Sequence, residues 1–159
     1  MRLALLTLAL FSFVACDDQA ADPHAGHGHS HAGGGHVHVA PHGGALVVLG
    51  NESLHVEFVL DDDGALTAYV LDGEAERAVR LAAESLELAV TLEDGTAFDV
   101  VLPAIASELT GETVGDTSEF RAREPRLAGV ERFEGKLGAV EALGATFPPT
   151  PFPYPKGNE

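Results

Sequence analysis

The chain contains few of the sulfur-bearing residues on which small exported or redox proteins often depend. Its 159 residues include one cysteine, one methionine and no tryptophan. A lone cysteine has no intramolecular disulfide partner, and the lone methionine is Met1, so neither a structural disulfide nor a thioether-rich Cu(I) site is expected. Nor does any apolar run reach the roughly 20 residues that a membrane-spanning helix requires.

Basic residues are also scarce, since nine Lys and Arg face 25 Asp and Glu, for a net charge of −16 with neutral histidines. Such a surface repels nucleic acid and attracts cations, so nucleic-acid partners are not expected. The sequence also lacks a nucleophile motif, a phosphate-binding glycine loop and an HExxH helix. We therefore expect no enzyme. A metal hydrolase built on His42, His55 and Glu57 is the one enzymatic alternative left open.

The N-terminus has the pattern of an export signal, with Arg2 followed by an apolar run over residues 3–14. Residues 13–16, Phe-Val-Ala-Cys, resemble the lipobox of bacterial lipoproteins, in which cleavage before the cysteine precedes its acylation. The resemblance implies a signal peptide over residues 1–15 and a lipid bilayer anchor, such as palmitate, on Cys16. Asp17 and Asp18 resemble the inner-membrane retention signal of enteric bacteria. The inner membrane facing the periplasm is therefore slightly favoured, with the outer membrane as the alternative.

Residues 16–40 combine many His, Gly, Ala and Asp residues with few large apolar ones, which predicts a disordered linker. Neutral imidazole binds Zn(II), Cu(II) and Ni(II) near neutral pH, so a tethered metal-binding arm is predicted. Two alternatives need no metal: a plain spacer, and a pH-sensitive arm that gains charge below about pH 6.5. Seven of the eight histidines lie here or just beyond, at His24, His27, His29, His31, His36, His38 and His42.

Beyond the linker the apolar period is two, which predicts strands. Residues 86–92 alternate apolar and polar side chains, and Asp94-Gly95 then predicts a hairpin with residues 96–102. The same reasoning pairs residues 54–60 with 66–71. Further strands are predicted at residues 45–49, 77–81, 119–123, 136–140 and 145–152. Residues 127–143 also suit helical spacing, although their glycines argue against one long helix. The pattern predicts one all-β domain over residues 41–152, an antiparallel β-sandwich or barrel-like fold, before a flexible tail over residues 153–159.

An ordered metal site is predicted where this domain begins. Strand alternation places His55 and Glu57 on one face, and pairing of the first two strands would bring His42 toward them. A His, His, Glu shell with an open position is typical of zinc sites. The alternative is that His55 and Glu57 are solvent-facing strand residues and that His42 belongs to a turn.

Three runs carry a family resemblance: Pro-His-Gly-Gly at residues 41–44, Leu-His-Val-Glu-Phe-Val at 54–59 and Ala-Tyr-Val-Leu-Asp at 68–72. They resemble a domain of small His-rich bacterial lipoproteins, which is similar to the N-terminal domain of some periplasmic adaptor subunits of heavy-metal efflux pumps. The resemblance implies association with metal handling. The chain lacks the coiled-coil hairpin and lipoyl-like segments of an adaptor, so it implies at most an accessory to efflux.

Together these features predict a lipid-anchored periplasmic protein that binds or buffers divalent transition metal, with a metal-efflux or other envelope protein as its candidate partner. The competing hypothesis is a structural or partner-binding envelope module, in which the arm supplies reach and no metal is needed.

Overall fold

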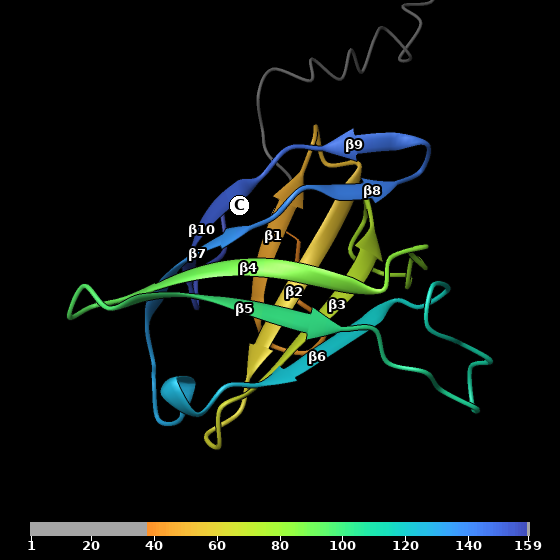
Figure 1. Ribbon diagram of the computed structural model, residues 1–159. Helices are drawn as coiled ribbons and strands as arrows, with labels where there is room; N and C mark the ends of the chain where they lie inside the picture. The colour runs from red at the N-terminus through yellow and green to blue at the C-terminus, as the bar shows by residue number, and fades with distance from the viewer. Residues whose placement is uncertain (1–37, 159) are drawn as a thin grey trace, which may run out of the picture. The chain divides into compact units, whose positions relative to one another are not determined.

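The computed structural model describes residues 38–158, and these fold into ten strands and one short 3-10 helix (Figure 1). All strand pairs are antiparallel. Two four-stranded sheets have the orders β1-β2-β3-β6 and β10-β7-β4-β5, and β8 pairs with β9. The elements are β1 (Ala45–Leu49), β2 (Leu54–Leu60), β3 (Ala65–Asp72), β4 (Ser85–Leu92), β5 (Ala97–Pro103), β6 (Glu119–Arg123), η1 (Pro125–Leu127), β7 (Phe133–Leu137), β8 (Val140–Ala142), β9 (Ala145–Phe147) and β10 (Thr150–Tyr154).

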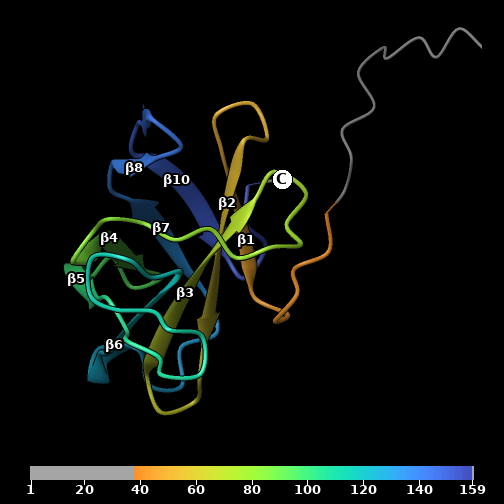
Figure 2. The same cartoon turned by 90° about the vertical axis from the view of Figure 1, so that its right-hand side faces the viewer.

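The two large sheets pack face to face, and β4 and β5 cross in front of β2 and β3 in Figure 1. Figure 2 shows the sheets on opposite sides of the core. Alternate residues of each strand supply the apolar interior, as the period of two predicts. The rings of Phe58 and Phe152 stack across it with centroids 4.9 Å apart. A Cβ at Gly135 would lie 2.6 Å from Cζ of Phe152, so glycine makes room for that ring. The predicted all-β sandwich is confirmed.

The sandwich is partly closed along both edges. On one side Ile105 N donates to Glu119 O at 2.8 Å, which ties the end of β5 to β6. On the other side Asn158 N donates to Leu46 O at 3.2 Å, and Val48 N donates to Asn158 Oδ1 at 2.7 Å. These bonds occupy backbone groups at the open edges, where an unpaired strand would otherwise offer a template for pairing.

Six of the strand predictions are confirmed. Strands β1, β2 and β6 have the predicted bounds, and β3, β4 and β5 lie within two residues of theirs. The β4–β5 hairpin turns at Asp94-Gly95, where Gly95 takes a φ of 86° and Asp94 Oδ1 accepts from Thr96 N at 2.8 Å. Local turn chemistry and alternation were sufficient there.

The remaining strand predictions need correction. Residues 77–81 make isolated bridges rather than a strand, because Ala78 pairs with β3 whereas Leu81 pairs with Thr117. The strand predicted at 136–140 is interrupted after Leu137, giving β7 and β8, and residues 127–143 contain no α-helix. The strand predicted at 145–152 is two strands, since Pro148 and Pro149 carry no amide donors for a ladder.

Both predicted ends of the domain are also wrong. Residues 153–158 are not a loose tail, because β10 continues to Tyr154 and Gly157 N donates to Pro153 O at 2.9 Å. At the other end His38 and Ala40, placed in the linker by sequence, pack against the sheet. The predicted signal peptide and the rest of the linker lie outside the described residues. Within residues 38–158, no helix is long and apolar enough to cross a bilayer.

Candidate functional site

The candidate site lies on the face of β2 that points away from the sandwich core. His55 and Glu57 share this face, as alternation predicts, but both are fully buried. The alternative that they face solvent is therefore wrong. A second, smaller apolar cluster of Leu46, Leu71 and Ala75, with Ala40 packed against it, covers part of this face. Two polar side chains are thus enclosed between the sheet and the segments that overlie it.

Glu57 holds the segment that precedes β1. Its Oε1 accepts from the amides of His42 and Gly44, both at 2.8 Å, and its Oε2 lies 2.7 Å from His42 Nδ1. Gly43 N donates to Ala40 O at 3.1 Å, closing a turn with Pro41 at its second position. The predicted approach of His42 to this face is confirmed. Both oxygens of the buried carboxylate are occupied by these contacts.

Glycine is required at both glycine positions of the Pro-His-Gly-Gly run, for a different structural reason at each. Gly43 takes a φ of 76°, a conformation that L side chains rarely adopt. A Cβ on Gly44 would collide with the backbone carbonyl of Phe58, so only glycine brings its amide close enough to β2 to reach Glu57. The run is therefore explained by the shape of one hydrogen-bonded turn.

His42 is held in a defined orientation at the surface. Because a carboxylate only accepts, the Nδ1 atom of His42 donates to Glu57, and in the neutral ring the lone pair is on Nε2. The ring stacks on Tyr69, with centroids 3.8 Å apart and planes at 15°. Its side chain is 42% exposed, whereas that of Glu57 is 0% exposed. A carboxylate behind an imidazole is the outer-shell arrangement that commonly orients a metal-binding histidine.

His55 is oriented in a similar way by a backbone carbonyl. Its Nδ1 atom lies 2.9 Å from Asp72 O, which can only accept, so the neutral ring again has its lone pair on Nε2. That buried Nε2 atom makes no hydrogen bond within residues 38–158. The His38 ring lies edge-on to the His55 ring, with centroids 4.8 Å apart. His38 and His55 therefore form an imidazole pair in which His55 is fully buried and His38 is partly buried.

Asp72 fixes this region through both its backbone and its side chain. Its Oδ1 accepts from the amides of Glu76 at 3.0 Å and Arg77 at 3.2 Å, which shapes the loop after β3. The hydrogen bond from the Glu76 amide is the main reason that the pKa of Asp72 is lowered. The loop thus holds the carbonyl that orients His55.

The predicted His, His, Glu shell is not assembled. The structure brings His42 to Glu57 and His38 to His55, and no group of three or more His, Cys, Asp or Glu side chains able to hold a metal occurs between residues 38 and 158. The metal roles of these residues stay predictions. The remaining predicted site residues lie outside the described part of the chain: Cys16, His24, His27, His29, His31 and His36.

Sequence reasoning missed Tyr69, Asp72 and the place of His38 within the domain. Tyr69 was within reach of prediction, because it lies opposite Glu57 in the antiparallel register of β2 and β3. The Asp72 carbonyl and His38 had no comparable local signal, since their contacts with His55 depend on how a loop and an incoming segment fold over the sheet.

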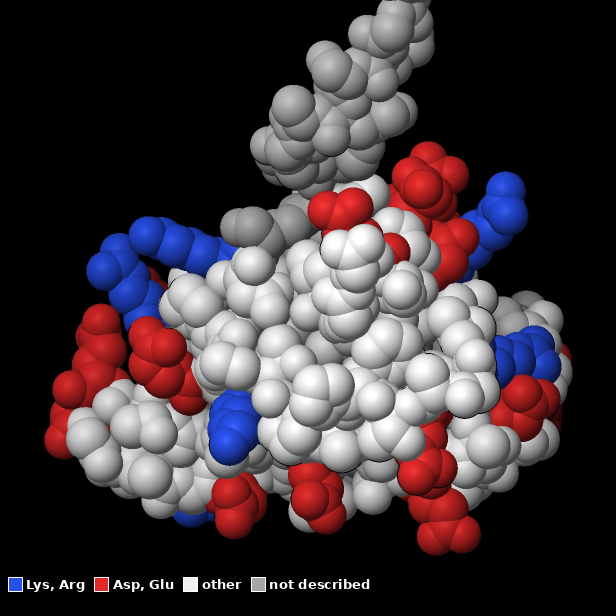
Figure 3. All heavy atoms as spheres, turned by 90° about the horizontal axis from the view of Figure 1, so that it is seen from above, with Lys and Arg blue, Asp and Glu red and all other residues white. Residues whose placement is uncertain are grey.

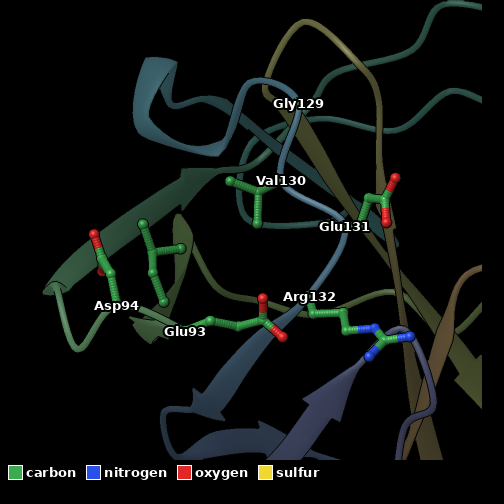
Figure 4. A pocket seen from close by; sticks show the side chains of 7 residues that line it. Glu93, Asp94, Gly129, Val130, Glu131 and Arg132 are labelled. Carbon is green, nitrogen blue, oxygen red and sulfur yellow. The ribbon is translucent and has the colours of Figure 1, made fainter.

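Several open pockets lie on the surface of the described domain. One of about 450 Å³ lies between the β4–β5 turn and the segment entering β7, with Glu93, Asp94, Glu131 and Arg132 among its lining residues (Figure 4). The Arg132 guanidinium extends away from the Glu93 carboxylate in that view. In Figure 3 acidic and basic side chains form small separate groups rather than one patch.

Fold and site together define a β-sandwich with two oriented histidine contacts on the covered outer face of one sheet. Comparison with known proteins adds no family: no family model, no curated protein and no solved structure matches this chain.

Proposed function

We propose that this chain is a lipid-anchored periplasmic protein that binds or buffers divalent transition metal and serves as an accessory to metal efflux. The observation that carries the proposal is the orientation of two imidazoles, those of His42 and His55, in the domain that follows the histidine-rich arm in the sequence. His42 and His55 each direct Nδ1 at an oxygen acceptor, which leaves the Nε2 lone pair as the donor for a metal.

Position along the chain supports the same proposal. The arm carries histidines at residues 24, 27, 29, 31 and 36, and it leads into His38 and His42 of the domain. The strongly acidic composition favours cations in the surrounding solution. Many weak imidazole ligands that precede a few oriented ones in the sequence suit capture of a metal ion by the arm and its transfer to the domain. The sequence signals at Cys16 and at Asp17-Asp18 support anchoring at a membrane, with the inner membrane favoured.

The ligand chemistry favours Zn(II), Ni(II) or Cu(II). Imidazole nitrogen is a borderline ligand that these ions bind well, and the chain beyond Met1 has no methionine and no cysteine other than Cys16. Acylation of Cys16 would remove that thiolate from the ligand set. A soft Cu(I) site is therefore disfavoured.

Calorimetric titration of the mature chain, residues 16–159 in detergent, with Zn(II), Cu(II) and Ni(II) tests the proposal. The comparison is a chain of equal length in which Ser replaces His24, His27, His29 and His31. We expect the replaced chain to bind at least about one ion fewer, because imidazoles supply the affinity. Unchanged stoichiometry would make the arm a spacer, and no binding by the unaltered chain would reject metal buffering altogether.

A further inference from the structure

The covered histidine of β2 has an unusual combination of properties. His55 is 0% exposed, its Nδ1 atom donates a hydrogen bond to the Asp72 carbonyl, and its Nε2 atom makes no hydrogen bond within residues 38–158. A buried polar atom without a partner costs about 1–3 kcal/mol, so such atoms are rare and call for an explanation. A nitrogen lone pair that water cannot reach is suited to a partner that brings positive charge.

We propose that His55 and His38 form a metal site inside the domain, with Nε2 of His55 as its fixed ligand, separate from His42 and Glu57. This inference rests on the proposed metal function and names the ordered ligands within it. Its occupant is a divalent ion of the zinc, nickel or copper group, because two neutral imidazoles are the donors offered.

The environment of His55 meets the usual requirement for an oriented imidazole ligand. A metal-binding histidine commonly donates its other ring N–H to a carboxylate or backbone carbonyl, and Asp72 O takes that role at 2.9 Å. His55 lies in β2 between Val48 of β1 and Leu71 of β3, so hydrogen-bonded strands fix it on both sides. The ligand is held before the metal arrives, which reduces the entropy lost on binding.

His38 supplies the second, adjustable ligand. Its ring lies edge-on to that of His55 at 4.8 Å, and its Nε2 atom is buried as well. The neighbouring Val39 is 83% exposed, so His38 belongs to a segment with room to shift as an ion enters. Two nitrogens leave coordination positions open, since zinc prefers four ligands. An incomplete shell of this kind suits metal exchange.

Glu57 and His42 are excluded from this site by the contacts they already make. Both carboxylate oxygens of Glu57 accept hydrogen bonds from residues 42–44. The His42 ring stacks on Tyr69 instead of meeting His55. His42 therefore lies outside the proposed site, although its Nδ1 atom is oriented in the same way as that of His55.

The test replaces His55 by asparagine, whose amide nitrogen can keep the Nδ1 hydrogen bond to Asp72 O while Nε2 is lost. Zn(II) is titrated into the mature chain while ring nitrogens are followed by NMR. We expect His55→Asn to weaken the tightest zinc-binding step by more than about tenfold, in line with the 10- to 100-fold cost of losing even an outer-shell partner. The control is Glu112→Gln, at a buried carboxylate that accepts from Ser118 and Thr110, and it should leave that step unchanged. In the unaltered chain, the first equivalent of zinc should shift the Nε2 resonances of His55 and His38.

A second variant protects the test against loss of fold. His38→Phe keeps an aromatic edge against His55 but removes the nitrogen, and it should also weaken the tightest step, with the methyl spectrum of the core unchanged. If both His55→Asn and His38→Phe bind zinc as the unaltered chain does, the site is refuted while metal binding by the arm stands. If the unaltered chain binds no zinc, both proposals fail.

Discussion

Glu57 and Glu112 are two buried carboxylates that tie irregular segments to the same sandwich, but their partners differ. Glu112 Oε1 accepts from Ser118 Oγ at 2.6 Å and from Ser118 N at 3.0 Å, and its Oε2 accepts from Thr110 Oγ1 at 2.7 Å. These partners belong to one loop, and Arg80 Nε lies 3.6 Å from Oε1. The hydrogen bond from the Ser118 hydroxyl is the main reason that the pKa of Glu112 is lowered.

Glu57 makes the same kind of tie, but one of its partners can bind something else. The amides of His42 and Gly44 donate hydrogen bonds to the Glu57 carboxylate, just as the Ser118 amide donates to the Glu112 carboxylate. The His42 ring instead has a second nitrogen and a half-exposed face. A buried carboxylate by itself therefore indicates a structural role. The His42 imidazole bound to Glu57 is what suggests a role in metal binding. Variants at each carboxylate can separate these roles.

Glu57→Ala should have the largest effect on stability. It leaves two backbone amides and an imidazole without their acceptor on a face that is fully buried at Glu57. Each buried donor left without an acceptor costs about 1–3 kcal/mol, and backbone amides cannot rotate toward another partner as hydroxyl groups can. Urea unfolding followed by circular dichroism should show this loss in the midpoint. Glu57→Gln keeps the shape and one acceptor oxygen, so it should lose less. A loss below about 1 kcal/mol for Glu57→Ala would contradict the described role of the carboxylate.

Glu112→Ala should cost less, about 1–3 kcal/mol, because Ser118 and Thr110 are the main groups left without an acceptor. The same unfolding experiment measures it. Zinc titration sharpens the comparison, since Glu112 has no histidine among its partners and its loss should leave the metal affinity unchanged. Equal losses of zinc affinity at Glu57 and Glu112 would mean that both carboxylates act only through overall stability.

Predictions from the sequence were correct where the residues that determine a structure lie within one strand or one turn. Strands β1 and β2 follow from alternation, and their pairing brings His42 to Glu57 as predicted. Such predictions failed where the cause is distant in sequence. Nothing local to β2 shows that residues 38–44 fold over its polar face, so solvent exposure of His55 was a reasonable but wrong alternative. The strand predicted at residues 145–152 is divided because Pro148 and Pro149 have no amide N–H for a ladder.

A third carboxylate, Glu124, extends the comparison to the surface and should show the smallest effect. It accepts from Arg126 N at 3.0 Å and from Arg126 Nε and Nη2 at 2.7 Å, and the Arg126 side chain is 51% exposed. The Arg126 side-chain hydrogen bonds lower the pKa of Glu124 from its usual 4.5 to about 2.

Because the folded pKa of Glu124 is depressed, its stabilisation is present above pH 4.5 and is lost as the pH falls toward 2. Solvent screens the pair, so Glu124→Gln should lower Tm at pH 7 by at most about 3 °C. Thermal unfolding of both chains should show this difference shrinking as the pH falls through 2, because Glu124 then loses its charge and resembles Gln. A difference that persists at low pH would trace the effect to the cap that Glu124 places on η1 instead of to its charge.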